Sequence, residues 1–131
     1  MDNKPIDILL IEDNPGDCRL IQEMMAEAGG AQFKLECVDR LTRGLERLET
    51  SDIGLILLDL GLPDSRGFDT FARTYARAPQ VPIVVLSGLA DEDLAIKTVQ
   101  AGAQDYLVKG QLDSYLLLRT IRYAIERKRA A

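Results

Sequence analysis

Short apolar segments alternate along this chain with longer segments in which apolar residues recur every three or four positions. The short segments are typical of strands, because each spans only a few residues and ends in charged or turn-forming residues. Strict alternation of strands and helices indicates a parallel sheet, whose right-handed crossovers place helices on both faces. We therefore predict a doubly wound α/β fold with strands at Ile6–Ile11, Phe33–Val38, Ile53–Leu58, Pro82–Ser87 and Gln104–Val108.

Two of these strands differ in pattern and can be placed in the sheet. Phe33–Val38 alternates apolar and polar residues like a half-buried strand, and we expect it near the sheet edge. Ile53–Leu58 is apolar without alternation, as in a central strand covered on both faces. The length of 131 residues fits one domain. The predicted helices cover approximately residues 18–28, 41–49, 68–75, 91–101 and 112–129.

Charge and hydropathy exclude several classes of protein. The net charge of −5 argues against a general binder of nucleic acid or anionic membranes. No apolar run approaches the ~20 residues of a membrane span, and the first residues lack the features of a signal peptide. We therefore expect a cytoplasmic location, no contact with a membrane, and no nucleic-acid binding by this domain.

Histidine and cysteine content narrow the chemistry further. The chain has no histidine, which excludes Ser-His-Asp triads and zinc sites that use histidine. Cys18 and Cys37 are not in a CxxC arrangement. In a reducing cytosol we expect them to be small buried side chains rather than a disulfide or a metal pair.

Charged and hydroxyl residues directly follow four of the five predicted strands. In doubly wound folds, ligands bind beyond the carboxyl ends of the strands, so these side chains should converge at one edge of the sheet. The set comprises Glu12 and Asp13, Asp59, Ser87 and Lys109. Strand two instead ends in Asp39-Arg40, remote from this edge if that strand is the outermost.

Three converging carboxylates raise one another's pKa unless a cation joins them, and Mg²⁺ prefers a few carboxylate oxygens together with water. Lys109 adds a positive charge suited to a phosphate or a carboxylate. A carboxylate nucleophile, Mg²⁺, a lysine and a hydroxyl are the parts needed to accept a phosphoryl group as an aspartyl phosphate.

With these residues in place, the chain resembles the receiver domains of two-component response regulators. The matching segments are LLIEDNP, LLDLGLPDSRG, IVVLSG and GAQDYLVKG, in order over nearly the whole chain. The resemblance implies a flavodoxin-like (βα)5 domain spanning residues 1–131, with sheet order 2-1-3-4-5. It implies Asp59 as phosphoacceptor and Mg²⁺ held by Glu12, Asp13, Asp59 and the backbone carbonyl of Gly61. It also implies Ser87 as switch hydroxyl, Lys109 as phosphate partner and Tyr106 as switch aromatic.

The same resemblance implies a signalling switch rather than an enzyme for external substrates, catalysing only its own phosphotransfer and autodephosphorylation. Its partners would be a sensor histidine kinase or a histidine phosphotransfer protein. A second copy could bind through the face formed by helix four, strand five and helix five. The basic end of the last helix, IRYAIERKRAA, resembles receiver exits that lead into a linker and an output domain in a longer chain. Its simpler interpretation is a basic C-terminus that suits the helix dipole.

One position departs from the family pattern. Receivers commonly follow the lysine with a proline in a cis peptide bond, whereas this chain has Lys109-Gly110. A cis bond before a residue other than proline costs a few kcal/mol, so we expect a trans bond there. This departure concerns the geometry of the loop that enters the last helix.

Three other functions share parts of this pattern. An aspartyl phosphatase of the haloacid dehalogenase kind would need a second acid two residues after the nucleophile, where this chain has Gly61. A flavodoxin-type flavin module would need a hydroxyl- and glycine-rich phosphate loop where Glu12 and Asp13 stand. A receiver that works without phosphorylation remains an alternative, although every site residue is present. Individually, Asp59 could cap a turn, Lys109 could be a solvated surface residue, and Tyr106 could serve packing.

Overall fold

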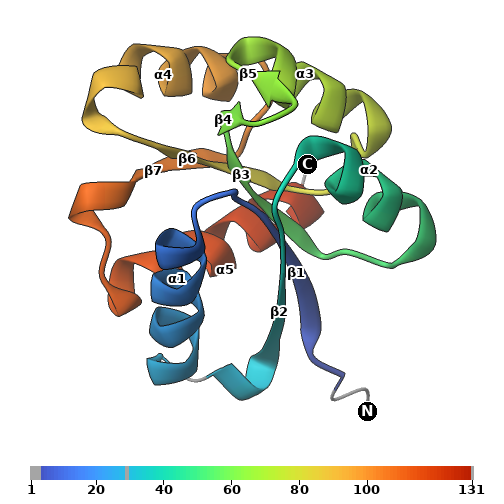
Figure 1. Cartoon of the computed structure of the whole chain (residues 1–131). Coiled ribbons are helices and arrows are strands. Elements are labelled where there is room, and N and C mark those ends of the chain that lie inside the picture. Colours follow the sequence, from blue (N-terminus) through green and yellow to red (C-terminus); the bar gives the residue numbers. More distant parts are fainter. Residues whose placement is uncertain (1–3, 29, 131) are drawn as a thin grey trace.

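The computed structural model describes residues 4–28 and 30–130. The chain forms one central sheet between two layers of helices (Figure 1). Five parallel strands lie in the order β2-β1-β3-β6-β7, which confirms the predicted order 2-1-3-4-5. The strands are β1 (Ile6–Ile11), β2 (Phe33–Val38), β3 (Leu55–Asp59), β6 (Ile83–Ser87) and β7 (Asp105–Val108). Strand β2 lies at the edge and β3 at the centre, as their patterns predict.

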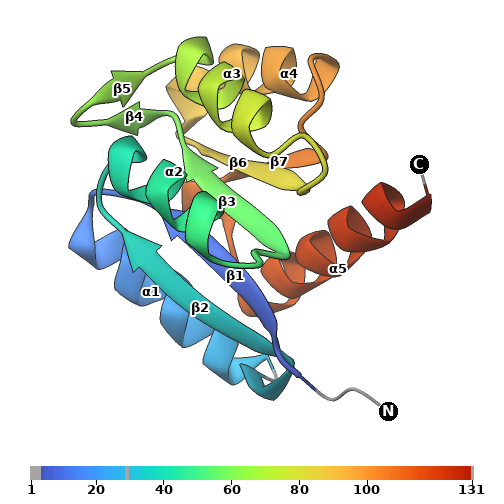
Figure 2. The same cartoon turned by 90° about the vertical axis from the view of Figure 1, so that its right-hand side faces the viewer.

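Helices cover both faces of the sheet (Figures 1 and 2). Helices α1 (Pro15–Glu27) and α5 (Ser114–Ala130) lie on one face, and α2 (Leu41–Thr50), α3 (Phe68–Arg77) and α4 (Glu92–Gln100) lie on the other. Successive strand side chains point to opposite faces, so each inner strand contributes to two apolar clusters. In β1, Ile8 and Leu10 pack beneath α1 and α5, whereas Leu9 and Ile11 belong to the cluster that includes α2 and α3 residues. This double burial explains why β3 shows no apolar–polar alternation.

Some element boundaries differ from the sequence prediction. The last helix begins at Ser114 rather than near residue 112, because Asp113 caps it by accepting a 2.7 Å hydrogen bond from the Leu116 amide. The short hairpin of β4 (Gly61–Leu62) and β5 (Ser65–Arg66) was not predicted, since strands of two residues carry no recognisable pattern. No cis peptide bond occurs in residues 4–28 and 30–130, so the bond between Lys109 and Gly110 is trans as expected.

The expectation that the two cysteines stay unpaired is wrong in this structure. Cys18 on α1 and Cys37 on β2 are joined as a disulfide. Helix α1 packs over the face of β2 from which Cys37 projects, and this tertiary contact brings together residues whose spacing gives no signal.

Among the described residues, the helices are all too short or too polar to span a membrane.

The start of helix α2 is capped from outside the helix. Its own N-cap residue, Arg40, makes no side-chain capping bond. Asp64, in the turn between β4 and β5, instead accepts hydrogen bonds from the Leu41 amide (2.8 Å), the Thr42 amide (2.9 Å) and the Thr42 hydroxyl (2.6 Å). Loss of hydration in the turn would raise the pKa of Asp64, but these hydrogen bonds outweigh it and lower the pKa to about 2.

We expect Asp64→Ala to lower the free energy of unfolding by about 1 kcal/mol at pH 7, the usual effect of losing a carboxylate cap. Because the pKa of Asp64 is lowered on folding from 3.8 to about 2, its contribution is complete above about pH 4. It is then lost as the pH falls toward 2. Urea unfolding at pH 7 and at pH 3 measures both values. Glu46→Ala, which removes an exposed acid from α2, is the control. An equal loss of unfolding free energy in both variants would contradict the capping role of Asp64.

Candidate functional site

The acid pair that follows β1 is held in place by the backbone on either side. The Glu12 amide donates to the Val38 carbonyl at 2.9 Å, so the strand pairing extends one residue beyond β1. Glu12 is 1% exposed, whereas Asp13 is exposed. Asn14 then caps α1 by accepting from the Asp17 amide at 3.0 Å, and Pro15 occupies the first helical position. This abrupt change from strand to helix leaves both acids at the carboxyl end of the sheet.

Asp59 is the last residue of β3 and lies beside the acid pair. Its side chain is 15% exposed, at the rim of the apolar layer rather than inside it. One carboxylate oxygen, Oδ1, accepts from the Gly61 amide at 3.0 Å, and the other, Oδ2, faces Lys109. The carboxylate therefore has a fixed orientation toward the groups at the ends of β1 and β7.

Glu12, Asp13 and Asp59 can each direct one oxygen into the same small space, with these oxygens all within 4.8 Å of one another. Burial, together with the neighbouring Asp59, outweighs the lowering effect of Lys109 and raises the pKa of Glu12 from 4.5 to about 7. The negative charge of this cluster is therefore only partly compensated by the neighbouring positive groups. An all-oxygen set of this kind fits a hard divalent cation such as Mg²⁺.

Lys109 is the cation within this cluster. Its ammonium Nζ lies 2.5 Å from Glu12 Oε1, 3.0 Å from Asp59 Oδ2 and 3.0 Å from Asp17 Oδ2. Burial alone would lower the pKa of Lys109, but the three carboxylates outweigh this effect and raise it above its usual range. The amine is therefore charged throughout the physiological range.

Asp17 is a member of this cluster that the sequence pattern did not predict. It stands in the first turn of α1, three residues after the helix cap, where the helix still adjoins the end of β1. Its signal was its position in the segment EDNPGD, because the first turn after an acid pair returns toward the same sheet edge. The structure thus places four carboxylates and one ammonium together, one acid more than predicted.

Ser87 ends β6, the strand next to β3, and is 4% exposed. Its hydroxyl oxygen has no hydrogen-bond partner among the described residues. Buried hydroxyl groups usually have a partner, so an unpaired one at the carboxyl end of the sheet is a sign of a polar group that binds there.

Tyr106 and Gly61 are less closely tied to the cluster. Tyr106 lies in β7, and its hydroxyl donates a 2.8 Å hydrogen bond to Glu92 at the start of α4. This hydrogen bond to Glu92, together with burial, raises the pKa of Tyr106. No contact links its hydroxyl to the four carboxylates among the described residues, so its switch role stays a prediction. The Gly61 amide contacts Asp59, and a role for the Gly61 carbonyl also stays a prediction.

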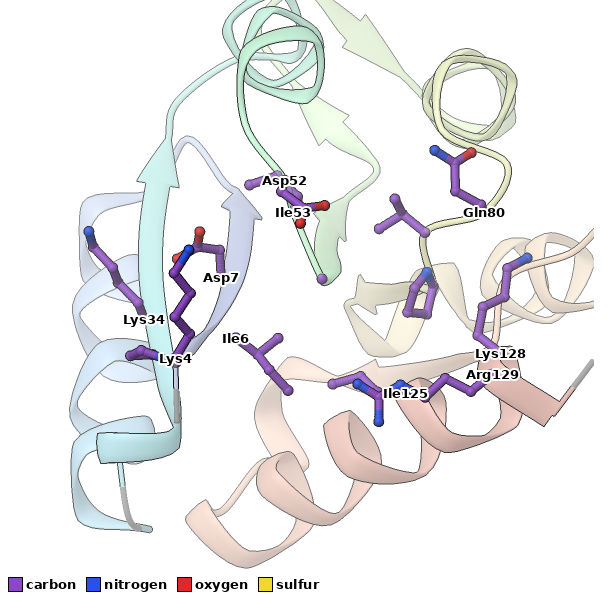
Figure 3. A pocket seen from close by; sticks show the side chains of 14 residues that line it. Lys4, Ile6, Asp7, Lys34, Asp52, Ile53, Gln80, Ile125, Lys128 and Arg129 are labelled. Atoms are coloured by element: carbon purple, nitrogen blue, oxygen red, sulfur yellow. The ribbon is translucent and has the colours of Figure 1, made fainter. Parts of the chain in front are cut away.

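A hollow lies at the other end of the sheet (Figure 3). It has a volume of about 1010 Å³ and is lined by residues including Lys4, Asp7, Asp52 and Lys128. None of the clustered acids, Lys109 or Ser87 lines it. The candidate site is therefore separate from this hollow, at the carboxyl end of the sheet.

Residues 8–122 match the family described as the response regulator receiver domain. The chain is 35% identical over 102 residues to the cell cycle transcriptional regulator CtrA of Caulobacter vibrioides, covering 78% of this chain and 43% of that protein. It is 35% identical over 121 residues to the KDP operon transcriptional regulatory protein KdpE of Escherichia coli, covering 89% of this chain and 52% of KdpE. The chain thus spans about half the length of these relatives.

Solved structures agree with this match. A response regulator receiver domain protein from Clostridium thermocellum superposes with a TM-score of 0.82 at 25% identity, covering 95% of this chain and 98% of that one. A CheY-like receiver domain protein from Methanospirillum hungatei gives a TM-score of 0.82 at 20% identity, covering 97% and 98%. The second likeness shows the fold alone.

Proposed function

This chain belongs to the response regulator receiver family of two-component systems, and from that premise we propose that Asp59 accepts a phosphoryl group. The donor would be a phosphohistidine on a sensor histidine kinase or a histidine phosphotransfer protein. The observation that carries the proposal is the convergence of Glu12, Asp13 and Lys109 on Asp59 at the end of the central strand. We do not assign it turnover of external substrates; the reactions it would catalyse are its own phosphotransfer and autodephosphorylation.

The transfer exchanges one bond to phosphorus for another. A carboxylate oxygen of Asp59 attacks the phosphorus, the bond from phosphorus to the histidine nitrogen breaks, and the imidazole leaves with the electron pair and is then protonated. Lys109, already 3.0 Å from Asp59 Oδ2, would hold a phosphoryl oxygen by charge-assisted hydrogen bonding. Glu12, Asp13, Asp59 and the Gly61 carbonyl would hold Mg²⁺, which when bound offsets negative charge on the phosphoryl group.

The switch would act through Ser87 and the adjoining face of the domain. The Ser87 hydroxyl, which has no partner among the described residues, would donate to a phosphoryl oxygen, and Tyr106 would shift with it. Helix α4, strand β7 and helix α5 adjoin these residues, and their exposed surface would change its preference for partners. A second copy of the domain is one such partner.

The relatives are described as transcriptional regulators and are about twice as long as this chain. We propose that this domain controls an output domain in a longer chain, reached through the basic end of α5. Its place of action would be the cytoplasm, where sensor kinases present their phosphohistidine.

The direct test uses the native chain, Mg²⁺ and the small phosphodonor acetyl phosphate. Intact-mass spectrometry should show one phosphoryl group per chain, stable in acid and labile in base, as an acyl phosphate is. The adduct should not form when a chelator removes Mg²⁺. Absence of an adduct at saturating Mg²⁺ and donor would defeat the proposal.

The affinity for Mg²⁺ should rise with pH and level off above about pH 7. Because the pKa of Glu12 is raised from 4.5 to about 7, the metal-free site keeps a proton that Mg²⁺ must displace at lower pH. Below pH 7 the affinity should fall by up to about tenfold per pH unit. Calorimetric titration at pH 5.5, 6.5 and 8 measures this slope. Glu12→Gln, which has no proton to lose, should bind weakly with a flatter profile, and a flat profile for the native chain would contradict the assignment.

A further inference from the structure

The Lys109 ammonium lies close to three carboxylates, and an ammonium group has three N–H donors. The partners are Glu12 at 2.5 Å and Asp17 and Asp59 at 3.0 Å each. Two of these partners have a second task under the proposed function: Glu12 and Asp59 belong to the acid trio that fits a divalent cation. Asp17 lies outside that trio, so its carboxylate is not needed for the metal or for the phosphoryl group.

Asp17 is well placed to hold the lysine. Its backbone amide donates to the Asn14 side chain at 3.0 Å, which fixes the first turn of α1. Its carboxylate is 34% exposed, and in the described part of the chain its partner is the Lys109 ammonium, 92 residues further along the sequence. Lys109 itself is 26% exposed and follows a strand, so without a fixed partner its long side chain could turn toward solvent.

We propose that Asp17 is a positioning residue that anchors Lys109 over Asp59. This inference rests on the proposed function and adds a residue to it. When a cation and a phosphoryl group engage Glu12 and Asp59, Lys109 loses two of its three carboxylate partners. Asp17 keeps the third, so the ammonium stays within reach of the phosphoryl oxygens. Long charged side chains lose much rotamer freedom when they are held, and a prepositioned lysine avoids that loss during the reaction.

A different role for Asp17 predicts the opposite sign. If its charge only repelled the anionic phosphoryl group, removing it would speed phosphorylation. If it anchors Lys109, removing it slows phosphorylation and weakens the binding of beryllofluoride, a phosphoryl mimic. Mg²⁺ affinity should change little in the anchor case, because Asp17 is not a member of the acid trio.

The test compares Asp17→Ala and Asp17→Asn with the native chain at saturating Mg²⁺. We expect Asp17→Ala to lower the rate of adduct formation from acetyl phosphate and the affinity for beryllofluoride about tenfold, as losses of supporting contacts at metal sites do. Asp17→Asn keeps an oxygen that accepts from the ammonium and should lose less. Glu23→Ala removes an exposed acid of the same helix that pairs with Arg19; it is the matched control and should behave like the native chain.

Two further measurements separate anchoring from a general structural effect. In a Lys109→Met background, Asp17→Ala should cause no additional loss, because the two residues act as one unit. In the metal-free chain, nitrogen-15 NMR should show faster proton exchange at the Lys109 ammonium in Asp17→Ala but not in Glu23→Ala. An unchanged or faster phosphorylation rate in Asp17→Ala would overturn the anchor. A native chain that forms no adduct would instead refute the proposed function itself.

Discussion

Replacing Asp59 with asparagine should abolish the phosphoryl adduct under conditions in which the native chain is fully modified. The amide oxygen of asparagine is neutral and a poor nucleophile, so the bond to phosphorus does not form. The fold should survive, because an amide oxygen can still accept from the Gly61 amide and Lys109 keeps Glu12 and Asp17. Intact-mass spectrometry after incubation with Mg²⁺ and acetyl phosphate measures the result.

Asp39→Asn is the control for this substitution. Asp39 directly follows strand β2, as Asp59 follows β3, but β2 lies at the sheet edge and Asp39 pairs with Arg40 and Arg43 instead of Lys109. It should be phosphorylated like the native chain. An undiminished adduct in Asp59→Asn would contradict the assignment of the phosphoacceptor, and peptide mapping would then show which of the other acids carries the group.

The sequence was sufficient to predict that the main candidate residues meet, because their convergence follows from the same strand pattern that predicts the fold. A continuous apolar run such as Leu55–Leu58 requires cover on both faces, which implies a parallel sheet with all strand ends at one edge. Residues that follow separate strands must then meet, and Glu12, Asp13, Asp59 and Lys109 do meet. No distance was needed for this inference, since the topology alone brings these residues together.

Three features that the sequence did not reveal depend on contacts between distant elements. Asp64 caps α2 from a turn 22 residues away from Thr42, and a turn acid has no pattern that names its partner. The pairing of Cys18 with Cys37 follows from how α1 lies on the sheet. Asp17 lies two residues beyond the matching segment LLIEDNP, and its contact depends on Lys109 reaching it from the end of the last strand.

Replacing Lys109 with methionine should destabilise the metal-free chain by about 2–3 kcal/mol at pH 8, since removing one partner of a mostly buried ion cluster leaves the other charges uncompensated. The pKa of Glu12 is already raised on folding from 4.5 to about 7 and should rise further without the lysine. A raised acid pKa contributes stability at low pH that is lost as the pH rises through the folded value. The difference between native and variant should therefore be small near pH 5 and largest above pH 7.

Magnesium should reverse most of this loss. A cation that binds only the folded chain stabilises it by about 2.7 kcal/mol at one hundred times its dissociation constant. The gain should be larger in Lys109→Met than in the native chain, because the ammonium no longer competes for Glu12 and Asp59. Urea unfolding of both proteins at pH 5 and pH 8, with and without Mg²⁺, gives the free energy of unfolding under each of the four conditions. Lys97→Met, on the exposed side of α4, controls for loss of a surface charge. If Lys109→Met and Lys97→Met had the same free energy of unfolding at pH 8 without metal, the prediction would be wrong. The negative charge of the four clustered acids would then not depend on Lys109 for its compensation.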